Sequence, residues 1–395
     1  MNDKIQLFKQ VLSEDNISLD PSDCRVYGAD TSKNFQGTAA CVLFPRSAED
    51  VQKIVQLCRI HKLPLVPSGG RTGLCGGATA SESEIVLSLA KMSRVLEICQ
   101  FDRIARVQAG VTTEQLKGAA AQVGLDFPIS LASQGTSQIG GNIATNAGGI
   151  HFLRYGPTRN WVLGLTVVTG TGEILRTGKA LYKDNTGYDL RSLFIGSEGT
   201  LGIITEATLA LTHRVEEKTR VLCALNTLEK SIVLLDRVRH CFPELSAFEL
   251  FTDRAIHYVL KHHELRDPFA TRYPCYILVE LESPLETLQN RLENSFGKLI
   301  EDDLVADVVI AQSSKQSEEL MNLREFISET LSSHYTPFKN DVSVPVSAIP
   351  GFTSDLEEGF LRLAPTYTLV IFGHVGDGNL HVNWIKPENE TPIDF

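Results

Sequence analysis

The chain has 395 residues, of which 37 are Lys or Arg and 48 are Asp or Glu, so its net charge at pH 7 is −11. With 43% hydrophobic and 22% charged residues it is typical of a globular protein, and its length exceeds one ordinary core, which predicts two or more domains. No Lys/Arg-rich block is present, so nucleic acid is not an expected partner.

Signals for export or membrane insertion are absent from the sequence. No apolar run approaches the length of a membrane span, and the first residues, MNDKIQLFKQVLSED, lack the apolar core of a signal peptide. The 8 cysteines are scattered and form no C-x-x-C pair, which favours reduced thiols over a disulfide framework. We therefore expect a cytoplasmic protein without a transmembrane segment.

The first half of the chain predicts mixed strands and helices. Residues 1–36 are polar apart from a short amphipathic helix at Ile5–Leu12. A strand, a helix with Ser47 as its N-cap, and a second strand then follow, and a glycine-rich loop comes directly after that second strand. The further expected elements are strands at 85–89 and 104–110, a helix at 112–124, a β-hairpin at Trp161–Gly178 and a strand at 201–211.

The glycine content and the pattern of expected elements change near residue 214, where we place a domain boundary. From Glu216 onward glycines are few, and strand-like and helix-like stretches alternate. That order suggests an α+β sheet with helices on one face. The chain thus divides into an N-terminal helical segment (1–36), a first domain (37–214) and a second domain (215–395).

Three glycine-rich stretches mark the first domain: Pro67–Gly77, Ser133–Gly149 and Phe194–Ala207. The first, PSGGRTGLCGG, matches neither a Walker A loop nor G-x-G-x-x-G. One such loop alone would more simply be a tightly packed turn. Three of them favour a large phosphate-bearing cofactor, because successive backbone N–H groups form concave anion sites. Arg71, the charge inside the first loop, is expected to face a pyrophosphate.

With these motifs the chain resembles, over about residues 37–395, the FAD-dependent oxidoreductases of the vanillyl-alcohol-oxidase type. The resemblance is carried by PSGGRTGLCGG, Thr136–Gly149 and Lys183–Ala207, and it is closest to the branch that acts on D-2-hydroxyglutarate, D-lactate and glycolate. It implies an α+β fold: a two-subdomain FAD-binding fold, then an α+β substrate domain with an antiparallel sheet. The first loop has no His and Cys75 lies deep among glycines, so we expect non-covalent FAD.

The resemblance assigns FAD contacts to residues of the three loops. These are Pro67, Ser68, Gly69, Gly70, Arg71, Thr72, Gly73, Gly76, Gly77, Ser133, Gly135, Gly140, Gly141, Asn142, Thr145, Gly148, Gly149, Glu198, Gly202 and Ile203.

A second motif, TLVIFGHVGDGNLHVNW, predicts a β-hairpin that carries two histidines. If Asp377-Gly378 is a two-residue turn, His374 lies opposite His381, with Cβ atoms about 4.5–5.5 Å apart. Two imidazoles so placed can share a divalent ion, and Asn383 is expected on the same face. An isolated pair would more simply be hydrogen-bonded. The symmetric register and the resemblance, which implies two metal ligands here, favour Zn²⁺ or another divalent metal.

The family completes this site with a Glu followed by a His, well C-terminal of the hairpin. No such motif occurs before Phe395, so either the sequence is a fragment or the site lacks its third ligand, and we expect the catalytic base beyond Phe395. Glu388 and Glu390 lie too close to the strand end to be assumed as substitutes.

A long amphipathic helix at Ser313–His334 carries the candidate substrate site. Arg324 and Ser328 lie four residues apart beside its apolar stripe. Alone, such an arginine would more simply be a surface residue whose charge reaches solvent. The resemblance implies that Arg324, Ser328 (usually Thr in the family) and Lys339, fifteen residues after the arginine, hold substrate carboxylates, with Asn383 nearby. A pair of cations suits a diacid.

We therefore expect FAD- and metal-dependent oxidation of a D-2-hydroxy acid, D-2-hydroxyglutarate first, to the 2-oxo acid. The metal would lower the pKa of the substrate hydroxyl, and electrons would pass to a separate acceptor such as an electron-transfer flavoprotein or a quinone. A D-lactate or glycolate dehydrogenase is the nearer alternative, and an FAD-binding subunit without its own chemistry is the alternative of another class. The oligomeric state stays open, with a homodimer among the options.

Overall fold

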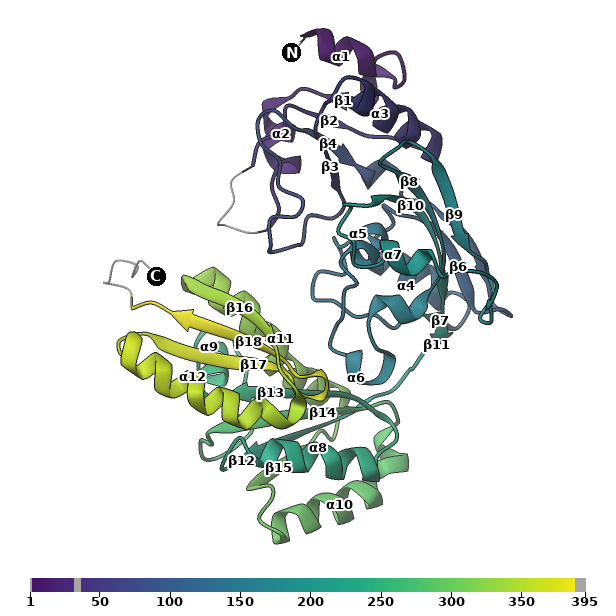
Figure 1. Cartoon of the computed structure of the whole chain (residues 1–395). Coiled ribbons are helices and arrows are strands. Elements are labelled where there is room, and N and C mark those ends of the chain that lie inside the picture. Colours follow the sequence, from purple (N-terminus) through teal and green to yellow (C-terminus); the bar gives the residue numbers. More distant parts are fainter. Residues whose placement is uncertain (1, 32–36, 388–395) are drawn as a thin grey trace. The chain divides into compact units, whose positions relative to one another are not determined.

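The computed structural model describes residues 2–31 and 37–387 (Figure 1). Its internal contacts divide the chain into two compact units. The N-terminal unit ends at Gly149 and resumes over Gly156–Arg214, whereas the C-terminal unit takes Ile150–Tyr155 and everything from Val215 onward. The excursion at Ile150–Tyr155 had no signal in the sequence that we recognised.

The N-terminal unit is built on two main sheets. The first contains, in order, β1 (Ile17–Ser18), β2 (Cys41–Leu43), β4 (Ile85–Ser88) and β3 (Leu65–Ser68). The strands β2, β4 and β3 are parallel, which requires a crossover connection, and α3 (Ala48–Ile60) joins β2 to β3. The second sheet is antiparallel and contains β5 (Val95–Cys99), β6 (Ile104–Gln108), β10 (Gly202–Ala210), β8 (Val162–Thr169) and β9 (Ile174–Gly178).

The helices of this unit begin where capping residues stand in the sequence. The Ser47 hydroxyl accepts the N–H of Asp50 at the start of α3, which confirms the predicted N-cap. At α4 (Thr113–Ala121), Thr112 and Gln115 form a reciprocal capping box. The other elements of this unit are α1 (Asn2–Phe8), α2 (Pro21–Tyr27), α5 (Ile139–Ala144), α7 (Arg191–Phe194), and the paired strands β7 (Leu125–Asp126) and β11 (Thr212–His213).

The C-terminal unit is one antiparallel sheet. Its strand order is β15 (Asp307–Ile310), β12 (Thr219–Leu225), β14 (Cys275–Leu281), β13 (Leu245–Thr252), β17 (Thr368–His374), β18 (Asn379–Ile385) and β16 (Pro337–Ser343). Its helices are α6 (Phe152–Tyr155), α8 (Lys230–Cys241), α9 (Asp253–His262), α10 (Leu285–Glu301), α11 (Ser314–His334) and α12 (Ile349–Leu363).

The expectation of helices on one face of this sheet was wrong. The helices α8, α10 and α12 share a hydrophobic core with one face, and α9 and α11 share another core with the opposite face (Figure 1). Every residue of β14 is buried: Ile277 and Val279 pack toward the first core, whereas Tyr276 and Leu278 pack toward the second. A strand that is buried on both sides reads as a continuous apolar run, and the stretch CYILVEL has this pattern.

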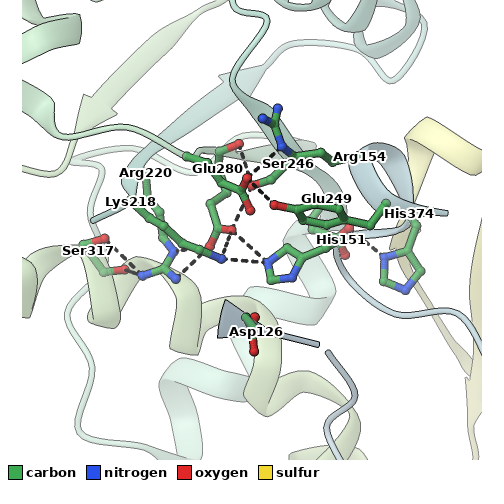
Figure 2. Close-up of polar contacts among 12 residues, drawn as sticks. Asp126, His151, Arg154, Lys218, Arg220, Ser246, Glu249, Glu280, Ser317 and His374 are labelled. Atoms are coloured by element: carbon green, nitrogen blue, oxygen red, sulfur yellow. Dashed lines mark hydrogen bonds and ion pairs between the residues drawn. The ribbon is translucent and has the colours of Figure 1, made fainter. Parts of the chain in front are cut away.

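One carboxylate interrupts that run and is fully buried. Glu280 contacts Lys218 and His151 at 2.8 Å and Arg220 at 2.7 Å, and Ser246 donates to it at 2.9 Å (Figure 2). Burial alone would raise the pKa of Glu280, but the hydrogen bond with His151 and the neighbouring cations outweigh it and hold this pKa well below its ordinary value. Because His151 belongs to the Ile150–Tyr155 excursion, the network joins this excursion to the sheet.

We expect Glu280→Gln to lower the free energy of unfolding of the C-terminal unit at pH 7 by about 3–5 kcal/mol, because it leaves buried cations without their carboxylate. The depressed pKa means that this stability is present above the ordinary carboxyl pKa, about 4.3, and is lost as the pH falls below it. Between pH 5 and 3, the free energy of unfolding of the variant should therefore fall less steeply as the pH falls. The difference in slope should correspond to about one bound proton. The measurement is urea unfolding followed by Trp384 fluorescence in a Trp161→Phe background.

The matched control is Glu319→Gln in α11, whose carboxylate is 45% exposed and lies 3.8 Å from Lys315. This change should shift the unfolding free energy by less than about 0.5 kcal/mol. Equal stabilities of the Glu280→Gln variant and the wild type would show that the network does not stabilise the unit.

Candidate active site

The three glycine-rich loops contact one another in the N-terminal unit. The first, Pro67–Gly77, starts at the end of β3, and a Cβ on Gly70 would run into the carbonyl oxygen of Thr136 in the second loop. The backbone N–H of Glu198 in the third loop donates to the carbonyl of Ala144 at 2.9 Å. Segments that lie far apart in the sequence therefore form one surface, and glycine at position 70 is required by a close approach of two backbones.

This surface has the room and the free polar groups that a nucleotide cofactor needs. A methyl group on Gly69 or Gly73 would meet no described atom closer than 3.6 Å, and on Gly141 none within 4 Å. The Ser68 hydroxyl and the Gln138 side-chain oxygen are buried and have no hydrogen-bond partner in the part of the chain that the structure describes. Buried polar atoms are normally paired, so these two indicate a missing partner. The residues present fit FAD.

Other predicted FAD residues serve the packing of the unit itself. A Cβ on Gly140, Gly149 or Gly202 would collide with neighbouring protein atoms. The Asn142 amide donates to a buried hydroxyl at 2.7 Å, and the Ile203 side chain lies in the hydrophobic core. These residues can reach a cofactor through their backbones only or not at all. The remaining predicted residues on the same loops are Pro67, Thr72, Gly76, Gly77, Ser133, Gly135, Thr145, Gly148 and Glu198.

Residues of the N-terminal segment form hydrogen bonds with the first glycine-rich loop. The sequence analysis did not predict these contacts. The Thr31 hydroxyl donates to the carbonyl of Arg71 at 2.9 Å, and Asp30 accepts the N–H of Gly76 at 2.8 Å. Arg71 has a left-handed backbone with φ of 57°, a conformation that is uncommon outside glycine and occurs often at binding sites. Its guanidinium lies 4.3 Å from the centre of the Tyr27 ring, so its contact with a pyrophosphate stays a prediction.

In the C-terminal unit, polar side chains gather on the sheet face that packs against α11. Strand pairing places Asp341 beside His381, Lys339 beside Asn383, and Glu249 beside His374. Residues two apart on a strand share a face, so His381 and Asn383 point the same way. The structure therefore brings the predicted metal and substrate residues of this unit onto one side of the sheet.

The hairpin that carries the two histidines has a different register from the predicted one. His374 pairs with Asn379, and His381 pairs with Phe372. Residues Val375–Asp377 form a helical turn, and Gly378 follows with φ of 81°, so the connection has four residues rather than two. The resulting shift of two residues keeps both imidazoles on one face, because side chains alternate with a period of two. The rings lie diagonally, with centres 5.4 Å apart and planes at 82°.

Each histidine has a carboxylate at its Nδ1 atom. Glu249 Oε1 lies 2.6 Å from His374 Nδ1 (Figure 2), and Asp341 Oδ1 lies 3.3 Å from His381 Nδ1. Burial alone would lower the pKa of His374, but the charge of Glu249 outweighs it and raises this pKa. The hydrogen bond with His381 holds the pKa of Asp341 below its ordinary value. Both Nε2 atoms remain for other ligands, the arrangement that carboxylates give metal-binding histidines.

The donor set suits a divalent cation but is not complete. Within residues 2–31 and 37–387, no group of three or more His, Cys, Asp or Glu side chains is placed to hold a metal ion. The two Nε2 atoms can supply two ligands. Glu388 and Glu390, which the sequence analysis did not accept as substitutes, lie outside the described residues.

Arg324 is buried, which excludes the alternative of a surface residue, whereas its predicted contact with a substrate carboxylate stays a prediction. Its side chain is 8% exposed, and its Nη2 atom lies 2.8 Å from Oε2 of Glu249. The guanidinium also lies 4.8 Å from the centre of the Phe372 ring. Arg324 Nε has no hydrogen-bond partner among the described residues, so this ion pair leaves hydrogen-bonding capacity on the guanidinium.

The predicted hydroxyl, Ser328, lies one turn further along α11, and the predicted lysine, Lys339, lies on β16. The Lys339 ammonium donates to Ser332 at 2.7 Å and to Ser328 at 3.5 Å. Ser332 was missed, although its position one helical turn after Ser328 could have indicated it. Glu249 and Asp341 were missed as well. The signal for Glu249 was a single acidic residue within the apolar strand LSAFELFT.

An N-terminal unit that fits FAD, followed by an antiparallel sheet with clustered cations and imidazoles, defines an FAD-linked oxidoreductase. Family models agree: residues 39–178 match the "FAD binding domain", and residues 214–393 match "FAD linked oxidases, C-terminal domain". The chain belongs to this family of FAD-linked oxidases and dehydrogenases.

Curated relatives cover nearly the whole chain. It is 43% identical over 394 residues to the D-2-hydroxyglutarate dehydrogenase of Stutzerimonas stutzeri (strain A1501), and the match covers 99% of this chain and 84% of that protein. The D-2-hydroxyglutarate dehydrogenase of Xanthomonas citri pv. viticola is 42% identical over 99% of this chain and 82% of its own length. The mitochondrial D-2-hydroxyglutarate dehydrogenase of Arabidopsis thaliana is 34% identical over 96% of this chain and 68% of its own length.

Solved structures support the fold. p-Cresol methylhydroxylase with bound substrate superimposes with a TM-score of 0.76 at 16% identity, over 97% of this chain and 82% of that chain. Alkyldihydroxyacetonephosphate synthase gives a TM-score of 0.76 at 17% identity, over 98% and 81% of the two chains. These likenesses confirm the predicted vanillyl-alcohol-oxidase type of fold. Among the described helices, none has the length and apolar character that crossing a membrane requires.

The open space at Gly141 gives a matched pair of substitutions. We expect Gly141→Ala in α5 to weaken FAD binding about tenfold or more, because the added methyl group would occupy space that the cofactor needs. Gly118→Ala in α4, where a Cβ also meets no described atom within 4 Å, should leave FAD affinity unchanged. The measurement is titration of the apoprotein with FAD, followed by flavin fluorescence. Equal affinities of the two variants would contradict the assignment of the cofactor to this surface.

Proposed function

We propose that the chain oxidises D-2-hydroxyglutarate to 2-oxoglutarate with non-covalent FAD and a divalent cation. Residues 37–214 would form the FAD-binding domain and residues 215–395 the substrate domain. The observation that carries the proposal is that Glu249 contacts both Arg324 and His374, so that a carboxylate-binding cation and a metal-binding imidazole lie side by side. The relatives with 42% and 43% identity, which are named D-2-hydroxyglutarate dehydrogenases, support it.

Two cations on this face favour a diacid. Arg324 is buried and oriented by Glu249, and its unused Nε atom can donate to a substrate carboxylate. Lys339 and the hydroxyls of Ser328 and Ser332 form a second polar group one and two helical turns away. D-2-Hydroxyglutarate has two carboxylates, whereas D-lactate and glycolate each have one. Asn383 lies on the same face and could donate to the substrate.

The histidine pair would hold a divalent cation through its two Nε2 atoms. Zinc is the first candidate, because imidazole nitrogens are common zinc ligands and an open position would remain for substrate. A cation there supplies Lewis-acid activation of the substrate hydroxyl, and FAD supplies the two-electron acceptor. The chain's own residues would fix the position of the hydroxy acid: Arg324 and Lys339 would bind its carboxylates and thereby orient C2.

Three further features belong to the proposal. The general base is a Glu-His segment C-terminal to the hairpin, as the resemblance implies. Electrons leave to a separate acceptor such as an electron-transfer flavoprotein or a quinone. The compartment is the cytoplasm, although several relatives are named mitochondrial.

The proposal is tested by reconstituting the chain, extended through its natural reading frame if this continues, with FAD and zinc. We expect D-2-hydroxyglutarate to bleach the flavin faster than D-lactate, glycolate or L-2-hydroxyglutarate, and a chelator to abolish the reaction. Acid denaturation should release free FAD. Flavin that none of these acids bleaches with zinc present would instead support an FAD-binding subunit without its own chemistry.

Arg324→Ala should raise KM for D-2-hydroxyglutarate about 10- to 100-fold, which corresponds to about 1.5–3 kcal/mol for a lost charge-assisted contact. FAD should stay bound. The effect on D-lactate should be smaller if Arg324 holds the distal carboxylate, and equal if it holds the carboxylate next to C2. Lys315→Ala, which removes an 86% exposed cation from the same helix, is the control. Unchanged steady-state kinetics for Arg324→Ala would remove it from the substrate site.

A further inference from the structure

A single buried carboxylate connects the two halves of the proposed substrate site. Glu249 lies in the middle of the sheet on β13, directly across from His374 on β17, and its side chain is 1% exposed. One oxygen lies 2.6 Å from His374 Nδ1, and the other lies 2.8 Å from Arg324 Nη2. Each carboxylate oxygen of Glu249 therefore contacts one of the two partners.

The contact with His374 determines which nitrogen of this imidazole can act. A carboxylate at Nδ1 holds the proton there, so the Nε2 lone pair remains for a cation, and it also fixes the rotation of the ring. The backbone adds to this constraint, because His374 and Glu249 are directly paired across two strands. His381 has a weaker version of the same arrangement, since Asp341 lies 3.3 Å away and its side chain is 69% exposed.

The contact with Arg324 determines where the guanidinium lies. The Phe372 ring lies 4.8 Å from the guanidinium carbon, and Glu249 holds Nη2 at the edge of the group. Since Arg324 Nε has no hydrogen-bond partner in the described part of the chain, the remaining donors can bind a further carboxylate. A guanidinium held in this way loses less freedom when it binds an anion than one on the surface.

Packing alone does not account for a charge at this position. The residues two positions away, which share the face of Glu249 on this strand, are Ala247 and Phe251, and both are apolar and fully buried, so this face of the strand is compatible with an apolar side chain. Burying an ion pair is often no more stabilising than packing apolar groups of similar volume. The charge must therefore serve its two partners rather than the core.

We propose that Glu249 is a positioning residue that holds the metal-binding His374 and the carboxylate-binding Arg324 in fixed register, so that cation affinity and substrate affinity depend on one shared side chain. The inference rests on the proposed function and extends it, because it assigns a role to a residue that touches neither the substrate nor the cation. It also explains why a mid-helix arginine and a hairpin histidine, 50 residues apart in the sequence, lie around one group.

The test uses Glu249→Gln in the FAD-loaded protein and two binding measurements that require no turnover. The amide can still accept from His374 but presents an N–H₂ group to Arg324, where it cannot pair. Zinc affinity is measured by competition with a chelator, and affinity for the product, 2-oxoglutarate, by the change that it causes in the flavin spectrum. We expect both affinities to fall, zinc by about 10- to 100-fold and the product by about tenfold or more.

Two matched variants separate positioning from general damage. Asp341→Asn, which removes the carboxylate beside His381 rather than the one beside Arg324, should lower zinc affinity and leave product affinity, measured at saturating zinc, unchanged. Glu319→Gln on the exposed side of α11 should change neither. If Glu249→Gln does not fold, Glu249→Asp tests the same geometry, because the charge is kept but the shorter side chain cannot reach both partners.

Double variants show whether Glu249 acts through its two partners. Adding Glu249→Gln to His374→Ala should cause no further loss of zinc affinity, and adding it to Arg324→Ala no further loss of product affinity. Additive losses, or unchanged affinities in Glu249→Gln, would overturn the inference while the proposed function stands. A wild-type protein that binds neither zinc nor 2-oxoglutarate would overturn the proposed function, and the inference with it.

Discussion

A carboxylate inside a protein must be surrounded by cations or donors, and this requirement organises the C-terminal unit. Glu280 and Glu249 lie on adjacent antiparallel strands, are almost inaccessible to solvent, and both point toward the side of the sheet that α11 covers. Each draws side chains from distant parts of the chain: Glu280 contacts His151, Lys218 and Arg220, and Glu249 contacts Arg324 and His374. The pKa of each carboxyl is held below its ordinary value by these partners despite burial. Charge compensation therefore helps to place α11 and the Ile150–Tyr155 excursion on the sheet.

The sequence predicted those parts of the fold and site that depend on local patterns. Glycine-rich composition was enough to find the three loops, and helical periodicity with the Ser47 cap was enough to find α3. The imidazoles were found for a subtler reason: the turn was wrong by two residues, yet alternation along a strand has a period of two, so the pair stayed on one face. An error of one residue in the turn would have separated them.

The parts that the sequence could not predict depend on long-range contacts. A lone acid such as Glu249 in an apolar strand has the same pattern whether it faces solvent or a buried arginine. Nothing near Asp30 or Thr31 indicates that they support a loop 40 or more residues away. Composition also does not separate the two uses of glycine in the loops: Gly141 leaves space free, whereas Gly140 beside it is small because Ala109 lies against it.

The excursion at Ile150–Tyr155 bears on how far the two halves of this chain are modular. The main chain passes from one unit to the other after Gly149, returns after Tyr155 and passes again after Arg214, so neither half is a continuous stretch of sequence. A boundary drawn at residue 214 separates His151 and Tyr155 from Glu280 and Glu282, their partners in the other half. Exchange of either half between related proteins by a single crossover would therefore split a buried ionic network. To keep this network intact, an exchange has to transfer the six residues Ile150–Tyr155 together with the sheet of the C-terminal unit.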